Sequence, residues 1–462
     1  MLIRRVPAAR MNCISFHDVP KVRARSSEMV FHDMNSEQKD KKQVLPVPEK
    51  KKTAITKKRR KRIGRPFAPL FYLAYPFVSL YFRLKYRVRV DRSATKGHRG
   101  PAIVLAPHVS AKDPYLTAMA LFPARATYVM SEHFITGKAM RAVCRIMHAV
   151  TKKMFCPDPG SVLKMIRAAK EGNTIVIFPE GRLTWYGRSL EVTDGTAELV
   201  KQLGIDVLTV TSYGAGMTFP KWAPKPRRGR ILVKSEKLLD ASEVRGMTVA
   251  EIDAKIRAAL RHDAETAMPG VRFRTKDTTL GLDGIIWKCP KCGEDYSLDC
   301  SGGHVRCREC GLDALLDEYG RFSGPGELAA AGISTVADWY EYCASTLDLD
   351  RPLVLSVALS ATGSDLYMKN DVGMGILTVT KDAISFEGEL DGRPDSFSVP
   401  TSRVAAFPIT VADHIDIYRD GRLILAAPIP DKRKAILPVA YLDRVTALRK
   451  SQEKQEGHES TD

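Results

Sequence analysis

Ala102-Ile-Val-Leu-Ala-Pro-His108 and Thr174-Ile-Val-Ile-Phe-Pro-Glu-Gly-Arg182 are the two stretches that decide the fold of the central region. Each begins with a short apolar run, which is typical of a buried strand, and continues into polar residues. Ligands of open α/β sheets bind beyond the carboxyl ends of the strands. The two stretches therefore predict one shared site, because His108 and Glu180 each come two residues after a predicted strand.

The residues around these stretches alternate between short apolar runs and amphipathic segments. Further strands are expected at 206–210 and 231–234, and a helix capped by Ser161 should precede the strand at 174–178. Thr248 and Glu251 form a capping box before a helix that is expected to run to about Ala264. This alternation predicts an α/β domain over residues 87–267.

The polar residues of the predicted site suggest proton transfer and anion binding. His108 is followed at a spacing of five by Asp113, whose carboxylate could hold the imidazole as a general base. Glu180, Gly181 and Arg182 follow the second strand, and an arginine fork suits phosphate oxygens. Asp113 could also be the N-cap of a helix that starts at a proline, a role compatible with catalysis.

These residues resemble the hallmark of the glycerolipid acyltransferase family, that of lysophosphatidate acyltransferases: His-x-x-x-x-Asp followed by Phe-Pro-Glu-Gly. The segments Gly181-Arg-Leu-Thr184 and Asp194-Gly-Thr-Ala197, with Gly187 between them, look most similar to the acyltransferase half of the bacterial 2-acylglycerophosphoethanolamine acyltransferase/acyl-carrier-protein synthetase. The synthetase half of that protein has no counterpart here. The resemblance covers residues 87–267.

The resemblance implies acyl transfer from a thioester, acyl-CoA or acyl-carrier protein, to the hydroxyl of a lysophospholipid in phospholipid synthesis or remodelling. His108 and Asp113 would be catalytic. The acceptor would be bound or oriented by Glu180, Gly181, Arg182, Thr184 and Ser110. Three departures concern acceptor identity. Pro107 replaces a common asparagine, the block at 146–159 is irregular and relies on Lys152 or Lys153 for its cation, and the stretch 209–214 lacks the usual proline.

Two Cys-x-x-Cys pairs predict a zinc ribbon at residues 285–315. Four thiolates in two knuckle-like turns suit a closed, tetrahedral, structural zinc site. Cys300 and His304 lie between the pairs and are expected to be spectators. Because the remaining cysteines are scattered, metal binding explains the pattern better than disulfides do. The predicted ligands are Cys289, Cys292, Cys307 and Cys310.

The chain is strongly basic, with a net charge of +19, but the charge is uneven. Residues 1–65 contain 19 of the 72 Lys and Arg and only 6 of the 53 Asp and Glu, and we expect a disordered basic arm there. Residues 66–86 begin with an almost wholly apolar and aromatic run, 66–82. This run is short for a span and contains Pro69 and Pro76, which should break a regular helix. An interfacial anchor on an anionic membrane surface is expected, and a buried first helix is the alternative.

The C-terminal third predicts a β-rich accessory domain at 350–450. A helix is expected near 335–345, then several short strands from 353 to 430 and a final helix over Val439–Lys450. A strand-rich barrel closed by a helix resembles the pleckstrin-homology and GRAM-like folds in element order. Residues 451–462 are expected to be a disordered tail.

Two other functions fit parts of this pattern. A nucleic-acid-binding protein would explain the charge and the ribbon, but not the polar residues after two successive strands, so nucleic acid is disfavoured as a partner. A catalytically silent lipid-binding scaffold would keep the fold without the intact His108, Asp113 and Glu180. The expected location is the cytoplasmic face of a membrane, as a peripheral or monotopic protein.

Overall fold

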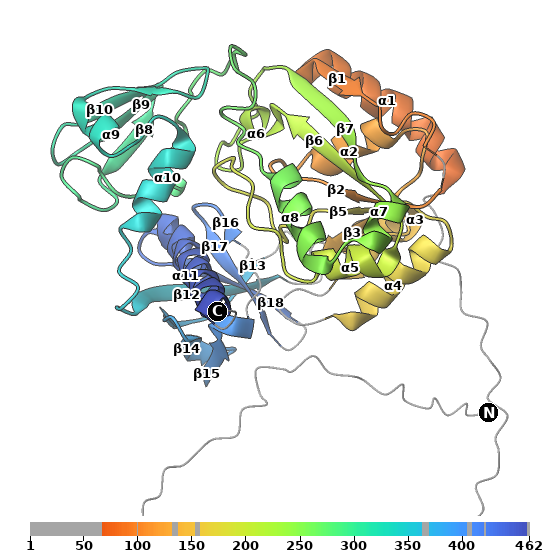
Figure 1. Cartoon of the computed structure of the whole chain (residues 1–462). Coiled ribbons are helices and arrows are strands. Elements are labelled where there is room, and N and C mark those ends of the chain that lie inside the picture. Colours follow the sequence, from red (N-terminus) through yellow and green to blue (C-terminus); the bar gives the residue numbers. More distant parts are fainter. Residues whose placement is uncertain are drawn as a thin grey trace, which may run out of the picture.

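The computed structural model describes most of the chain from Phe67 onwards (Figure 1). The predicted basic arm, Pro66 and Lys153 lie outside the described residues. The described ranges are 67–98, 100–131, 137–152, 158–362, 369–403, 409–419 and 422–459.

A seven-stranded mixed sheet forms the centre of the first domain, which confirms the α/β prediction. Strand β2 pairs in parallel with β5 on one side and β6 on the other, and its four apolar residues are fully buried. Only β6 and β7 pair antiparallel. The order is β1-β7-β6-β2-β5-β3-β4. The strands are β1 (Val88–Asp91), β2 (Ala102–Leu105), β3 (Thr127–Ser131), β4 (Val150–Lys152), β5 (Ile175–Ile177), β6 (Asp206–Tyr213) and β7 (Ile231–Leu239).

Helices cover both faces of this sheet and bury separate apolar clusters against it. The capping box of Thr248 and Glu251 is present, although its helix ends at Leu260, earlier than expected. The cap predicted at Ser161 is wrong: Asp158 caps that helix by accepting from the Ser161 N–H, and the helix begins at Pro159. The helices are α2 (Asp113–Leu121), α3 (Gly137–Ile146), α4 (Pro159–Lys170), α5 (Thr196–Leu203), α6 (Ala215–Thr218), α7 (Ala241–Gly246) and α8 (Val249–Leu260).

Helix α1 (Ala68–Tyr86) precedes this domain and packs on it along one side only. The expectation that its prolines would break it is wrong. Pro69 lies in the first turn, where no backbone donor is lost, and the helix continues through Pro76. Tyr75 stacks on Phe122 with 3.8 Å between ring centroids. Among the described residues, no helix is long and apolar enough to cross a membrane.

The cysteine module is a small antiparallel sheet in the order β11-β10-β9-β8. It is followed by α9 (Gly326–Ala330) and α10 (Val336–Ser345). The N-cap of α10, Thr335, makes a capping box with Asp338. Buried Glu265 also accepts from the first two N–H groups of α10, which ties the module to the end of the first domain. The strands are β8 (Leu298–Ser301), β9 (His304–Cys307), β10 (Asp313–Leu316) and β11 (Phe322–Ser323).

The C-terminal region is a seven-stranded antiparallel sheet in the order β15-β14-β13-β12-β18-β17-β16. Its edge strands β15 and β16 pair with β14 and β17. They do not pair with each other within the described residues, so the described strands form an open sheet in place of the expected barrel. The strands are β12 (Leu353–Thr362), β13 (Lys369–Val379), β14 (Ala383–Leu390), β15 (Arg393–Pro400), β16 (Ile409–Thr410), β17 (His414–Arg419) and β18 (Arg422–Pro428).

Helix α11 (Leu437–Glu459) ends this region and packs next to α10 and the second sheet (Figure 1). It extends beyond the predicted end at Lys450, so a tail starting at 451 is wrong for residues 451–459. Buried residues of α11 join one apolar cluster that also includes Trp185 and Trp222 of the first domain, the cysteine module and the second sheet. The cysteine module and the second sheet therefore share one apolar cluster, which Trp185 and Trp222 of the first domain join, while the first sheet keeps its own clusters.

Candidate functional site

His108 and Asp113 meet at the carboxyl end of β2. His108 Nδ1 lies 3.1 Å from Asp113 Oδ2, which also accepts from the Ser110 N–H at 2.8 Å. Asp113 is the first residue of α2, with Lys112 as N-cap, and its side chain is 1% exposed. Burial raises the pKa of Asp113, while its hydrogen bond to His108 acts against that rise. This arrangement selects the tautomer with hydrogen on Nδ1 and the lone pair on Nε2.

The imidazole of His108 is held in place but remains accessible. Its ring stacks on Phe178 with centroids 4.5 Å apart. The side chain is about a quarter exposed, and Nε2 makes no hydrogen bond to any described residue. A base needs its free nitrogen within reach of the substrate proton. The structure leaves that nitrogen available.

Glu180 supports this loop from the inside. Its Oε1 accepts from the backbone N–H of His108, and its Oε2 from that of Leu190, each at 3.0 Å. The side chain is buried, and burial raises the pKa of Glu180 to about 7. We expected Glu180 to contact the acceptor. With both carboxylate oxygens used on backbone donors, it instead joins the His108 loop to the loop that follows β5.

Thr184 and Gly181 complete this support. The Thr184 N–H donates to the His108 carbonyl at 3.1 Å, so the backbone of His108 is held on both sides by the 180–184 segment. Gly181 turns the chain at φ +75°, a conformation that strongly favours glycine. The Thr184 hydroxyl is buried without a partner among the described residues. Ser110 is also buried, and its hydroxyl accepts from the Lys112 N–H.

Arg182 does not lie open to solvent as a free anion clamp. Its Nη2 donates to Asp443 of α11, and its guanidinium lies over the Trp185 ring at 4.9 Å. The motif therefore splits: Glu180 and Thr184 face His108, whereas Arg182 faces the C-terminal helix. Asp443 was missed by sequence analysis because it carries no local signal.

Residues 87–213 match the acyltransferase family model. This segment is therefore similar to acyltransferase domains. Among solved structures, the 1-acyl-sn-glycerophosphate (LPA) acyltransferase PlsC from Thermotoga maritima is similar over 41% of this chain and 78% of that chain, with 19% identity and a TM-score of 0.35.

The first domain thus combines a histidine held by a carboxylate with a hydrogen-bonded support for its backbone. Of the predicted site residues, the structure brings together His108, Ser110, Asp113, Glu180 and Thr184 through direct hydrogen bonds. Lys152, the cation suggested for the irregular second block, ends β4 and is exposed. This geometry suits deprotonation of a hydroxyl by a neutral imidazole.

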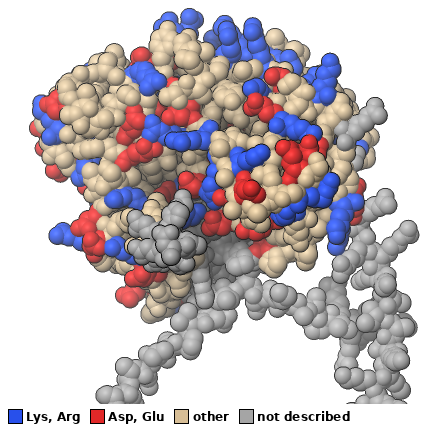
Figure 2. Space-filling model, viewed as in Figure 1, with Lys and Arg blue, Asp and Glu red and all other residues tan. Residues whose placement is uncertain are grey.

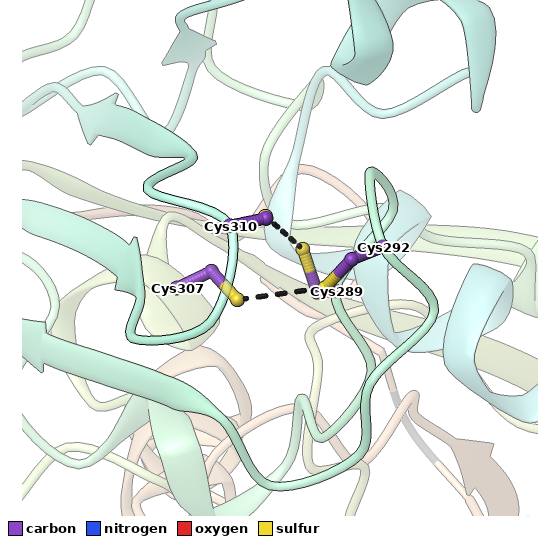
Figure 3. A group of neighbouring side chains, drawn as sticks. All are labelled: Cys289, Cys292, Cys307 and Cys310. Carbon is purple, nitrogen blue, oxygen red and sulfur yellow. Dashed lines mark hydrogen bonds between the residues drawn. The ribbon is translucent and has the colours of Figure 1, made fainter.

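The four predicted cysteine ligands form a second centre, in the β8–β11 module (Figure 3). All four sulfur atoms lie within 4.8 Å of one another. Cys289 and Cys310 are 3.6 Å apart, and Cys292 and Cys307 are 3.7 Å apart. A tetrahedral site with metal–sulfur bonds of about 2.3 Å has sulfur–sulfur edges of about 3.8 Å. The cluster could therefore hold a metal ion.

Cys300 and His304 lie outside that cluster. His304 Nδ1 is 2.7 Å from Asp313 Oδ1, so its ring is engaged elsewhere on the module. Ser297 Oγ lies 3.2 Å from the Cys307 sulfur and can donate to a thiolate there. The group that could hold a metal ion consists of the two Cys-x-x-Cys pairs.

Proposed function

We propose that the acyltransferase domain transfers an acyl chain from acyl-CoA or acyl-carrier protein to the free hydroxyl of a lysophospholipid such as 1-acylglycerol 3-phosphate. The observation that carries the proposal is His108, held through Nδ1 by buried Asp113 with Nε2 free of hydrogen bonds to described residues. It lies within the segment that matches the acyltransferase family.

The chemistry follows from that geometry. Nε2 of neutral His108 takes the proton of the acceptor hydroxyl as its oxygen attacks the thioester carbonyl. Asp113 stabilises the imidazolium that forms. The carbon–sulfur bond then breaks, and the thiolate leaves with the proton carried by His108. The products are an ester and a free thiol, and no covalent enzyme intermediate is required.

The test is an acylation assay with the purified, detergent-solubilised full chain. A panel of lysophosphatidate, lysophosphatidylethanolamine and other lysoglycerolipids is offered, each with acyl-CoA and with acyl-carrier protein. We expect one acceptor class and one donor to give clearly faster ester formation than the others. If no member of the panel is acylated by either donor, the proposed substrate class is wrong.

We further propose that α1 and the cations around it rest on an anionic membrane surface, as a peripheral or monotopic contact on the cytoplasmic face. On α1, Leu73 and Phe77 are 66% and 70% exposed. Exposed cations follow at its C-terminal end, and none of them forms an ion pair with a described residue. They are Arg83, Lys85, Arg87 and Arg89.

Further exposed cations lie near the start of β7. Arg230 neighbours Arg87, because Val88 pairs with Ile231. Arg228 forms an isolated β-bridge with Arg274. The side chains of Arg228, Arg230 and Arg274 are all exposed. Figure 2 shows Lys and Arg side chains gathered at the top of the view, around the upper end of β7. Cations next to an apolar helix face suit anionic headgroups above a hydrocarbon layer.

Vesicle binding tests this surface. The full chain should sediment with vesicles that contain phosphatidylglycerol more than with pure phosphatidylcholine. The double variant Leu73→Ser/Phe77→Ser should bind at least about tenfold more weakly, because each buried apolar side chain contributes on the order of 1.5–3 kcal/mol. Leu163→Ser on α4, which is 65% exposed, is the matched control. Equal binding by both variants would remove α1 from the interface.

The metal proposed for the four-cysteine cluster is zinc. Four thiolates at tetrahedral spacing favour it, and the closed set leaves no position for substrate. Zinc would therefore be structural here and take no part in acyl transfer.

A further inference from the structure

The motif arginine of the acyltransferase domain is occupied by the C-terminal helix. Arg182 lies two residues beyond Glu180, and its side chain is 10% exposed. Its Nη2 bonds Asp443 of α11, while its Nη1 is buried without a hydrogen-bond partner among the described residues. One half of the guanidinium fork thus holds a carboxylate, and the other half is unused.

The same loop of the acyltransferase domain is held by the C-terminal half of the chain at other points. Lys450, also on α11, bonds Asp194 at 3.2 Å. Arg188 bonds two carboxylates of α10, those of Asp338 and Glu341, each at 2.5 Å. Residues 182–194 therefore form a docking surface for α10 and α11. A phosphate could reach the fork of Arg182 only if α11 moved.

We infer that Asp443 competes with the phosphate of the acceptor for Arg182, so that α11 lowers the affinity of the acyltransferase domain for phosphate-bearing acceptors. The inference rests on the proposed function. Carboxylate and phosphate oxygens accept from the same arginine donors, and a phosphate can use both arms of the fork at once. Asp443 uses one arm, and the other arm, Nη1, has no partner among the described residues.

The unused donor is the observation that points to an anion at this arginine. Buried side-chain donors in a settled core are almost always paired. An arginine that only fastened α11 would be expected to have Nη1 satisfied by a carbonyl or a second carboxylate. At Arg182 the unsatisfied atom, Nη1, is on the side chain to which the resemblance to glycerolipid acyltransferases assigns the acceptor.

The substitution Asp443→Asn tests the competition, because it removes the charge and keeps the shape. With 1-acylglycerol 3-phosphate as acceptor, KM should fall about tenfold while kcat stays unchanged, since one charge-assisted hydrogen bond no longer competes. With 1-monoacylglycerol, which lacks the phosphate, KM should not change. Lys450→Gln is the matched control, because it breaks a neighbouring α11 contact without freeing Arg182.

Two outcomes of the kinetic test would overturn the inference. If Asp443→Asn leaves KM unchanged or raises it, Asp443 is a structural bridge. If Lys450→Gln lowers KM as much as Asp443→Asn does, the docking of α11 and not the Asp443 carboxylate controls the acceptor. A fall confined to Asp443→Asn and to phosphate-bearing acceptors supports the competition.

A binding measurement separates this inference from the proposed function. Trp185 lies 4.9 Å from the Arg182 guanidinium, so its fluorescence should respond when that group binds an anion. In titrations with sn-glycerol 3-phosphate, Asp443→Asn should bind about tenfold more tightly than the wild type. Arg182→Ala/Asp443→Asn should not respond. Tighter binding without acylation of any lysolipid would support the competition and reject the proposed reaction; equal binding would reject the competition.

Discussion

Replacing His108 with alanine is expected to reduce kcat about 10²–10⁴-fold, the range that a positioned general base contributes. The fold should persist, because the imidazole is partly exposed and stacks on Phe178 at the surface of the site. The measurement is the acyl-transfer rate with the best acceptor from the panel, together with circular dichroism and the unfolding temperature.

Two further variants test the residues that hold His108 in place. Asp113→Asn should cost nearly as much as His108→Ala, because it no longer selects the tautomer with a free Nε2. Glu180→Gln should lower kcat less than Asp113→Asn does. Glutamine keeps one side-chain oxygen as acceptor for one of the two backbone N–H groups that Glu180 holds. Acyl transfer by His108→Ala at more than a tenth of the wild-type rate would show that His108 is not the base.

Removing one thiolate of the proposed zinc site is expected to have the largest effect on stability. Cys289 is fully buried, and apparent zinc binding of roughly 10–16 kcal/mol can fold a small module that has little core of its own. That figure is comparable with the 5–15 kcal/mol that stabilises a typical protein. Cys289→Ser should therefore lose its metal and unfold the β8–β11 module.

The loss of stability should extend beyond the β8–β11 module, because the apolar residues of the module belong to the cluster that includes α10, α11 and the second sheet. Metal content and thermal unfolding of the purified full chain measure both effects. Cys300→Ser is the matched control: Cys300 lies on β8 of the same module but outside the four-cysteine group. If Cys289→Ser keeps one equivalent of metal and the wild-type unfolding temperature, the cluster is not a structural metal site.

The elements with strong local signals were predictable from sequence. The strands after Ala102 and Thr174 are short apolar runs, and the sheet buries them at its centre. The capping boxes at Thr248 and Thr335 depend on residues three positions apart. The cysteine pairs likewise bring most of their geometry with them, because each pair spans a single turn.

Elements that depend on distant partners were not predictable. Whether Glu180 points to substrate or to backbone depends on where the His108 and Leu190 N–H groups lie, and residue type does not reveal that. The open form of the second sheet depends on whether β15 and β16 meet. The length of α11 was underestimated because the residues beyond Lys450 are polar and lack a helical apolar pattern.

The sequence by itself determined the α/β class, the pairing of His108 with Asp113 and the four-cysteine group, since each follows from residues close together in the chain or from strand ends at one edge of a sheet. Only the tertiary structure decided the role of Arg182. Its partner Asp443 lies on the last helix, and the two meet because α11 packs in an apolar cluster with the cysteine module, the second sheet, and Trp185 and Trp222 of the first domain. Burial in that core brings together charges that no local pattern links.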